Sequence, residues 1–285
     1  MSTMSIKQLE KLYMEAKDKY YNSDKSIMSD YEFDELEEKI RKLNPKSKVF
    51  KVIGAEVKNG VKLPFNMMSL NKRKEDKEIN KWLQKYYKED IYLTDKLDGL
   101  SVIGHYNNGQ LQLLTRGAGQ YGLDITKIAK YMNLPQPDIN MIVRGEIIMK
   151  KSIFNDKYKS NYANARNLVS GAILRKNIVK EVIENIDIVW YSVYYPEKLI
   201  YSKQLDLLNK YNFRIVHNTN IGKNNKGTLN KICLTGYLKE RSEISDYNID
   251  GIVVQYNESI NTNLTKNPEN AFAFKINGEI KEVNV

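Results

Sequence analysis

TDKLDGLSV, residues 94–102, separates Lys96 from Asp98 by one leucine and continues with glycine and a run of small and apolar residues. The surrounding residues have the period of a half-buried strand. A lysine in such a strand is unfavourable unless its ammonium is paired, or unless the protein uses the loss of its proton that burial favours. The stretch therefore marks Lys96 as a candidate functional residue.

The chain around this stretch has the pattern of an α+β domain with antiparallel sheets. We expect residues 91–106 to form one strand, joined by a turn at 107–109 to a second strand that begins at Gln110. A short helix is expected around Trp82 and Tyr86. The periodicity elsewhere predicts strands at 141–149, 187–195, 213–216, 249–256 and 271–276, and helices at 163–175, 202–211 and 229–241.

The first 45 residues have the period of two amphipathic helices. Their apolar positions recur at spacings of three and four, first at Ile6, Leu9, Tyr13, Ala16 and Tyr20 and then at Phe33, Leu36, Ile40 and Leu43. Pro45 ends the second pattern, and Ser29 or Asp30 is placed to cap its start. Because a helical pair of this size buries little surface by itself, we expect it to pack on the rest of the chain or to act as a small module.

Several strands carry a charged residue among apolar or small neighbours. One such residue is most often a strand-end charge or a surface ion pair, but polar residues from several strands predict a pocket lined by a sheet. Arg144 and Glu146, two positions apart, share one face of their strand. The full set is Lys96, Asp98, Arg116, Arg144, Glu146, Asp250 and Lys275, with nearby glycines at 99, 117, 119 and 122 that let a ligand approach the backbone.

This set of side chains is suited to a nucleotide. Cations suit phosphate oxygens, and carboxylates suit Mg²⁺ or a ribose hydroxyl. The sequence has neither a Walker-type nor a dinucleotide-fold glycine pattern, so it lacks the usual phosphate cradles. A nucleotide site that uses a lysine covalently is the alternative.

The overall composition limits the possible classes of function. The chain has 285 residues and a net charge of +10, which fits a polyanionic partner such as nucleic acid, although a lysine-rich composition also follows from an AT-rich genome. One cysteine, Cys233, excludes an internal disulfide and a cysteine-rich zinc site. No apolar run is long enough to cross a bilayer and no signal peptide is present, so we expect a soluble intracellular protein with no membrane partner.

The motifs, taken in order, resemble those of the bacterial-type NAD⁺-dependent DNA ligases. KLDG (96–99), TRG (115–117), VRGE (143–146), NARN (164–167) and DGIVV (250–254) follow one another, behind a helical stretch, KYYNSDKSIMSDYEFDEL (19–36), that is similar to the module binding nicotinamide mononucleotide in that family. KxDG alone is also found in ATP-dependent ligases and capping enzymes, so the ordered series carries the resemblance. It implies a nucleotidyltransferase (ATP-grasp-like ligase) fold, with a helical module and connector at 1–66 and an adenylation domain at 67–285.

The resemblance implies roles for the pocket residues. Lys96 would attack the adenylyl phosphorus of NAD⁺, release nicotinamide mononucleotide and carry AMP. An ordinary lysine is neutral only about once in a few thousand at pH 7, and we expect burial and nearby cations to lower its pKa. In the same resemblance the catalytic set is Lys96, Asp98, Glu146, Asp250 and Lys275, and the set that binds NAD⁺ is Tyr20, Asp30, Asp34, Ser69, Leu70, Thr94, Lys96, Arg116, Glu146, Arg166 and Lys275.

Five positions depart from the family pattern. Thr94 stands where the family has a glutamate, and Ala118 where it has an acid. In the helical stretch Tyr21 replaces a histidine and Phe33 a tyrosine. Gln255 stands in place of a lysine and supplies no charge to a phosphate, which predicts slower adenylate chemistry, with an extra Mg²⁺ as one way to fill the gap.

The resemblance also implies partners. Family members continue into an OB-fold, a zinc module, helix-hairpin-helix repeats and a terminal interaction domain, which hold nicked double-stranded DNA. This sequence has ten residues after Lys275, so we expect self-adenylation with Mg²⁺ and poor sealing of nicks without further domains or a second subunit. The alternatives are an ATP-using nucleotidyltransferase of the RNA ligase or capping type and a degenerate, non-catalytic nucleotide-binding subunit.

Overall fold

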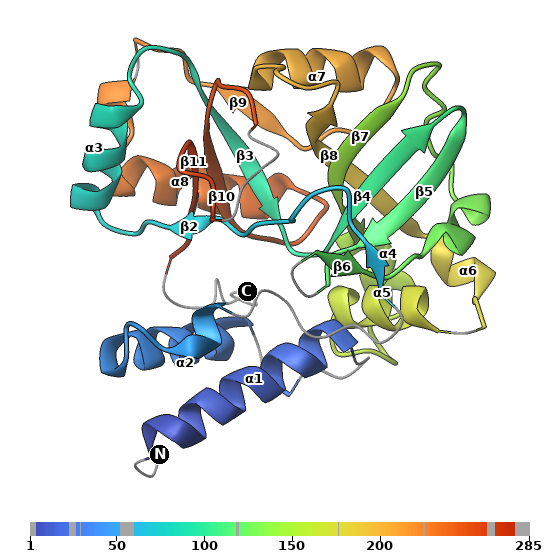
Figure 1. Cartoon of the computed structure of the whole chain (residues 1–285), viewed down its shortest axis with the longest axis horizontal. Coiled ribbons are helices and arrows are strands. Elements are labelled where there is room, and N and C mark those ends of the chain that lie inside the picture. Colours follow the sequence, from blue (N-terminus) through green and yellow to red (C-terminus); the bar gives the residue numbers. More distant parts are fainter. Residues whose placement is uncertain are drawn as a thin grey trace.

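Two largely antiparallel sheets form the body of the protein, and a pair of helices lies against one end of that body (Figure 1). The computed structural model describes residues 4–22, 27–28, 30–51, 60–117, 120–175, 177–224, 226–260 and 266–276. The predicted α+β class with antiparallel sheets is confirmed. Within the described ranges, no helix is both long enough and apolar enough to cross a membrane.

The first sheet has five strands and carries the predicted nucleophile. One face packs Phe272, Phe274 and Ile252 against helices α3 (Asp76–Lys85) and α8 (Lys231–Ile244). All its neighbouring strands are antiparallel except β2 and β11. The order across the sheet is β2 (Asn71–Lys72), β11 (Ala271–Phe274), β10 (Ile249–Tyr256), β3 (Ile91–Leu97) and β9 (Asn218–Asn220).

The second sheet has four strands and covers the largest apolar core. Val102, Val143 and Trp190 point from it into that core, where they meet Leu168 and Ile173 of a helix. The order across this sheet is β5 (Gln110–Thr115), β4 (Leu100–Asn107), β7 (Met141–Met149) and β8 (Ile186–Tyr195). The helices around it are α4 (Lys151–Lys157), α5 (Ala165–Leu174), α6 (Lys180–Ile183) and α7 (Tyr201–Lys210), with a 3₁₀ turn, η2, at Thr126–Tyr131. A further 3₁₀ turn, η3, at Lys226–Thr228 comes just before Leu229, which packs in the core of the five-stranded sheet.

The opening stretch of sequence connects the two sheets. We expected one continuous strand over 91–106, and this was wrong, because β3 ends at Leu97 and β4 begins at Leu100 in the other sheet. Alternation continues on both sides of the break, so periodicity does not reveal it. Gly99 allows the crossing, since a Cβ there would lie 2.4 Å from the carbonyl oxygen of Ile147 on β7.

Most other predicted elements are present, with small shifts at their ends. Strands 141–149 and 249–256 match β7 and β10, and the three predicted helices correspond to α5, α7 and α8. The strand expected at 213–216 is absent apart from an isolated bridge between Ile215 and Trp190. Its apolar residues Phe213 and Val216 are buried, so the run reflects core packing rather than a sheet strand.

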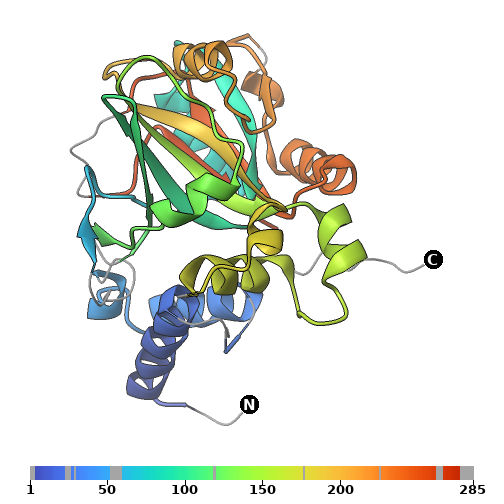
Figure 2. The same cartoon turned by 90° about the vertical axis from the view of Figure 1, so that its right-hand side faces the viewer.

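The N-terminal helices α1 (Ile6–Asn22) and α2 (Asp30–Leu43) form the predicted pair. Leu9, Tyr13, Leu36 and Ile40 make a separate small core, together with residues of a 3₁₀ turn, η1, at Lys48–Lys51. Leu43 was expected on the apolar face but is exposed. Figures 1 and 2 show this pair beneath the body from two directions.

The segment after the helical pair returns to the body. Strand β1 (Val61–Lys62) pairs with β6 (Tyr121–Gly122), and Leu63, Phe65 and Met67 pack against the four-stranded sheet. The division of the chain at residue 66 stays a prediction.

Replacing Gly99 with alanine tests whether the crossing between sheets needs a glycine. The added methyl group would meet the Ile147 carbonyl at 2.4 Å and the Glu146 Cγ at 2.8 Å, so backbone must move. We expect a loss of several kcal/mol in the free energy of unfolding, measured by urea denaturation. Gly236→Ala on the exposed surface of α8, where nothing lies within 4 Å, is the control and should add up to about 1 kcal/mol. Equal stability of Gly99→Ala and the wild-type chain would contradict this account.

Candidate active site

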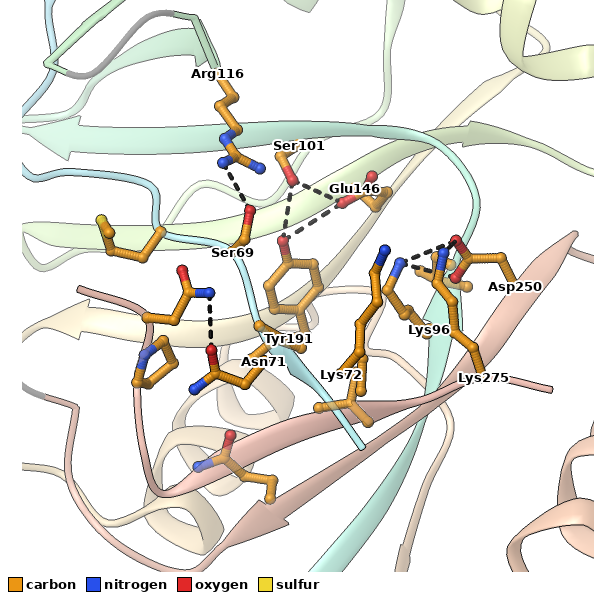
Figure 3. Close-up of a pocket in the computed structure, with 18 of the residues that line it drawn as sticks. Ser69, Asn71, Lys72, Lys96, Ser101, Arg116, Glu146, Tyr191, Asp250 and Lys275 are labelled. Carbon is orange, nitrogen blue, oxygen red and sulfur yellow. Dashed lines mark hydrogen bonds and ion pairs between the residues drawn. The ribbon is translucent and has the colours of Figure 1, made fainter. Parts of the chain in front are cut away.

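A cleft of about 1790 Å³ opens between the two sheets and the helical pair. Its floor comes from the face of the five-stranded sheet opposite α3 and α8, because paired residues Thr94, Val253, Ala273 and Lys72 share that face. One wall comes from β4, β7 and β8, and the other side is formed by α1 and α2. Figure 3 shows charged side chains from separate strands converging in this cleft.

A three-member charge cluster occupies the floor. The ammonium of Lys96 lies 2.8 and 3.0 Å from the two carboxylate oxygens of Asp250, and the ammonium of Lys275 lies 2.8 Å from the same carboxylate (Figure 3). Asp250 reaches this face because the register of β10 against β3 shifts between Ile249 and Gly251. Such bulges redirect single side chains next to functional sites.

The cluster changes the expectation for the nucleophile. Burial lowers the pKa of Lys96, as predicted, but Asp250, and more weakly Glu146 and Asp98, raise it further than burial lowers it. The pKa of Lys96 therefore lies above its ordinary value, and the expected depression is wrong for this arrangement. The sequence argument counted the neighbouring cations and missed that carboxylates lie closer. The lysines in turn lower the pKa of Asp250 to about 2, against the opposing effect of burial.

Glu146, unlike Asp250, has a pKa above that of an ordinary carboxyl group. Its carboxylate accepts a hydrogen bond from Ser101 at 3.1 Å and lies 3.4 Å from the hydroxyl of Tyr191 (Figure 3). Burial raises its pKa to about 7, although Lys96 and Arg144 pull in the other direction. A carboxyl group with this pKa is close to half-protonated at neutral pH, which suits proton transfer.

Further cations are fixed around the cluster. Arg166 on α5 forms an ion pair with Asp98, and burial lowers the pKa of this guanidinium to about 10. Arg116, just after β5, donates to the hydroxyl of Ser69 at 2.9 Å. Arg144 donates to the carbonyl of Met68 at 3.1 Å, so the segment that includes Ser69 is held from two sides.

Most of the predicted site residues come together in this cleft. The lining includes Ser69, Leu70, Thr94, Lys96, Arg116, Glu146, Arg166, Asp250 and Lys275. Asp98 is not among the lining residues, although it interacts electrostatically with Lys96. The side chains of Tyr20, Asp30 and Asp34, on α1 and α2, lie outside the described residues, and so do Ala118 and the side chain of Tyr21.

Three departures from the family pattern can be located. Thr94 is buried in the floor. Gln255 lines the cleft and donates its amide to the backbone carbonyl of Tyr256 at 3.1 Å. Phe33 stacks on Tyr13 at 4.7 Å between ring centroids.

Sequence reasoning missed several cleft residues. Ser101 and Tyr191 bind Glu146, but nothing in SVIGHY or IVWYSVYY distinguishes them from ordinary strand residues. Lys72 and Lys74 lie in a lysine-rich run, NKRK, and both line the cleft, but only strand pairing places Lys72 beside Ala273 on the floor. The alternation of side chains along a strand is the sequence signal that could have identified Lys72, but β2 has only two residues.

No group of three or more histidine, cysteine or acidic side chains placed to hold a metal is found among the described residues. Magnesium commonly binds one or two carboxylates together with substrate phosphates, and it needs no all-protein cage. Glu146 and Asp250 are carboxylates in the cleft that fit this kind of binding.

Comparison with protein families gives one match to most of the chain. Residues 57–279 match the family described as NAD-dependent DNA ligase adenylation domain. The chain belongs to this family. Its nucleotidyltransferase fold follows from that membership.

Curated relatives agree with the family. The chain is 40% identical to a DNA ligase of Acanthamoeba polyphaga mimivirus over 90% of this chain and 40% of that protein. It is 29% identical to a DNA ligase of the bacterium Lachnoclostridium phytofermentans over 98% of this chain and 46% of that protein. The chain spans less than half the length of these relatives.

Solved structures with a similar fold include a protein titled archaeal ATP-dependent RNA ligase. The TM-score is 0.46 at 12% identity, over 79% of this adenylation-family chain and 52% of that chain. A mycobacterial DNA ligase D complexed with ATP gives a TM-score of 0.40 at 11% identity, over 65% and 54% of the two chains.

Changing Asp250 to asparagine tests the charge cluster. The substitution removes the carboxylate that the ammonium groups of Lys96 and Lys275 share, so we expect about 3–5 kcal/mol lower free energy of unfolding at pH 7. The deficit should shrink as pH rises, because the buried Lys96, having lost its main counter-charge, gives up its proton at a lower pH. Urea denaturation between pH 6 and 10 measures both effects.

Asp206→Asn is the matched control for this test. It removes an exposed ion pair with Lys203 at 3.0 Å, so it should change stability by less than about 1 kcal/mol. An Asp250→Asn chain as stable as this control would contradict a stabilising cluster.

The raised pKa of Glu146 predicts a pH-dependent stability. Because the pKa of this carboxyl is higher folded than unfolded, its contribution is present below about pH 4.5 and is lost as pH rises through 7. Glu146→Gln cannot ionise, so its stability relative to wild type should rise by an amount on the order of 3 kcal/mol between pH 5 and pH 8. Thermal or urea unfolding of both chains at the two pH values measures it. A difference independent of pH would show that burial does not raise this pKa.

Proposed function

We propose that the chain is the NAD⁺-consuming part of a DNA ligase and carries AMP covalently on Lys96. The observation that supports this best is the ion pair of Lys96 with Asp250, a carboxylate that Lys275 also contacts. This cluster lies in a cleft whose volume of about 1790 Å³ is large enough for a dinucleotide. Family membership supports NAD⁺ as the donor and DNA as the final acceptor.

The first step is transfer of the adenylyl group. The neutral amine of Lys96 attacks the phosphorus next to adenosine, a nitrogen–phosphorus bond forms, and the phosphorus–oxygen bond to nicotinamide mononucleotide breaks. The electron pair of that bond stays on the phosphate of the leaving mononucleotide, and the lysine nitrogen gives up two protons in total. Cations that hold the two phosphates in line with the attacking nitrogen favour both the formation of the new bond and the breaking of the old one.

Asp250 and Lys275 have a defined role in releasing the nucleophile. Lys96 must leave its ion pair with Asp250 before its nitrogen can attack. Lys275 contacts the same carboxylate at 2.8 Å, so Asp250 keeps one partner while Lys96 moves. This limits the cost of separating a buried pair. Glu146, with its pKa near 7, is the nearby carboxyl group that can accept a proton at neutral pH.

The family resemblance assigns roles to the other predicted residues. Asp98 and Glu146 are proposed to bind ribose hydroxyls, and Arg116 and Arg166 to bind phosphate or ribose. Ser69 and Leu70, held by Arg116 and Arg144, are proposed to lie against the adenosine. Tyr20, Asp30 and Asp34 are proposed to hold the mononucleotide. Glu146 or Asp250, together with substrate phosphates, would hold magnesium, and the ion would supply charge stabilisation there.

The second and third steps concern DNA. AMP would pass from Lys96 to the 5′-phosphate of a nick, and the adjacent 3′-hydroxyl would then displace it. The net charge of +10 favours a polyanionic substrate. Because the chain spans less than half of its relatives, efficient sealing is proposed to need further domains or a partner chain.

The test is covalent labelling with NAD⁺ that carries its label in the adenylate. Wild-type chain with Mg²⁺ should retain the label on a denaturing gel, and Lys96→Ala should not. Peptide mapping should place the added nucleotide on Lys96. Labelling by ATP and not by NAD⁺ would favour an ATP-using enzyme, and labelling by neither would favour a non-catalytic subunit.

A further inference from the structure

Three lysines from three strands share the floor of the cleft. Lys72 on β2 pairs with Ala273 on β11, and Ala273 pairs with Val253 on β10, so these side chains point to one face of the sheet. Lys275 follows Ala273 by two residues, and Lys96 follows Thr94 by two on β3, which returns both to the same face. Figure 3 shows all three ammonium groups directed into the same part of the cleft.

The position of Lys72 relative to Lys275 follows from sheet geometry. Neighbouring strands are about 4.8 Å apart and two residues advance about 6.8 Å, so the two Cα atoms are roughly 8 Å apart. The ammonium of Lys72 lies 3.7 Å from the Glu37 carboxylate of α2, which is an ion-pair distance but longer than a hydrogen bond. The other oxygen of Glu37 accepts both hydrogen bonds of Arg41, at 2.7 and 3.0 Å.

Gln255 occupies the same face without a charge. It pairs with Ala271 of β11, which lies two residues before Ala273 and therefore on the same face. Its side-chain amide donates to the Tyr256 carbonyl at 3.1 Å. Lys72, and Lys74 two residues later, line the cleft at the β2 edge and bring positive charge to this side of the floor. Lys96 and Lys275 are both engaged with Asp250, so they are already neutralised in part.

We propose that the ammonium of Lys72 binds the phosphates of NAD⁺ from the β2 edge of the cleft and supplies the charge that Gln255 lacks. This rests on the proposed function and adds one residue to it. Lys96 reacts, Lys275 holds Asp250 and the α-phosphate, and Lys72 stabilises the negative charge that moves to the leaving mononucleotide phosphate. Its ion pair with Glu37 orients the side chain and links α2 to the nucleotide.

The experiment measures the rate of Lys96 labelling by NAD⁺ in the full chain with Mg²⁺. Lys72→Gln should lower this rate by about 10- to 100-fold, since one charge on a transferring phosphate is lost. Lys72→Arg keeps the charge and should retain most of the rate. Adding Gln255→Lys to the Lys72→Gln chain should recover at least about tenfold, because it returns a cation to the same face.

Lys203→Gln is the matched control. Lys203 forms an exposed ion pair with Asp206 on α7 and is not among the residues that line the cleft, so this change removes one positive charge and leaves the floor cluster intact. Its labelling rate should stay within about twofold of wild type. Circular dichroism melting of each variant separates a loss of rate from a loss of fold.

The outcomes separate the two claims. If the wild-type chain is never labelled by NAD⁺, the proposed function fails. If it is labelled and Lys72→Gln is labelled as fast, the role of Lys72 alone is overturned. Equal losses in Lys72→Gln and Lys203→Gln would also overturn it, because the loss would then follow from net charge and not from the place of Lys72 in the cleft. A low rate in both Lys72→Arg and the chain with Gln255→Lys would overturn it as well, because a cation at this face would then not restore the reaction.

Discussion

The ion pairs that Asp250 makes with Lys96 and Lys275 are the interaction on which the site depends. Three charged groups from β3, β10 and the end of β11 lie together on one sheet face, which is unfavourable for each alone and acceptable as a cluster. The register shift in β10 makes the cluster possible, because Asp250 would otherwise follow the alternation of the strand.

The opposite face of the same strands gives this cluster a rigid base. Asp95, next to Lys96, forms two 2.8 Å hydrogen bonds with Arg241 of α8, and both side chains are buried. Phe272 and Phe274 of β11 are fully buried against α3 and α8. Strand β3 is thus fixed from behind while Lys96 faces the cleft, so the ammonium of Lys96 is held on a regular element and not on a loop.

The surroundings of two carboxyl groups in the cleft shift their pKa values in opposite directions. Asp250 is held ionised by two lysines, with its pKa near 2, whereas burial raises the pKa of Glu146 to about 7. Groups whose pKa values are separated in this way suit different tasks in one reaction. Here one carboxylate serves as a fixed counter-charge and the other as a carboxyl group that exchanges protons at neutral pH.

The sequence by itself determined the class of fold, the strands that carry charge, and the identity of Lys96, Glu146, Asp250 and Lys275 as candidates, because alternation and motif order are local properties. It failed at Asp98–Gly99, where the chain changes sheets without a change of period. It also gave the wrong sign for the pKa of Lys96, since distances between charges on different strands are not a local property. Only the pairing of β2, β11, β10 and β3 decided which lysines face the cleft and which carboxylate meets them, because register sets the face of every side chain in a sheet.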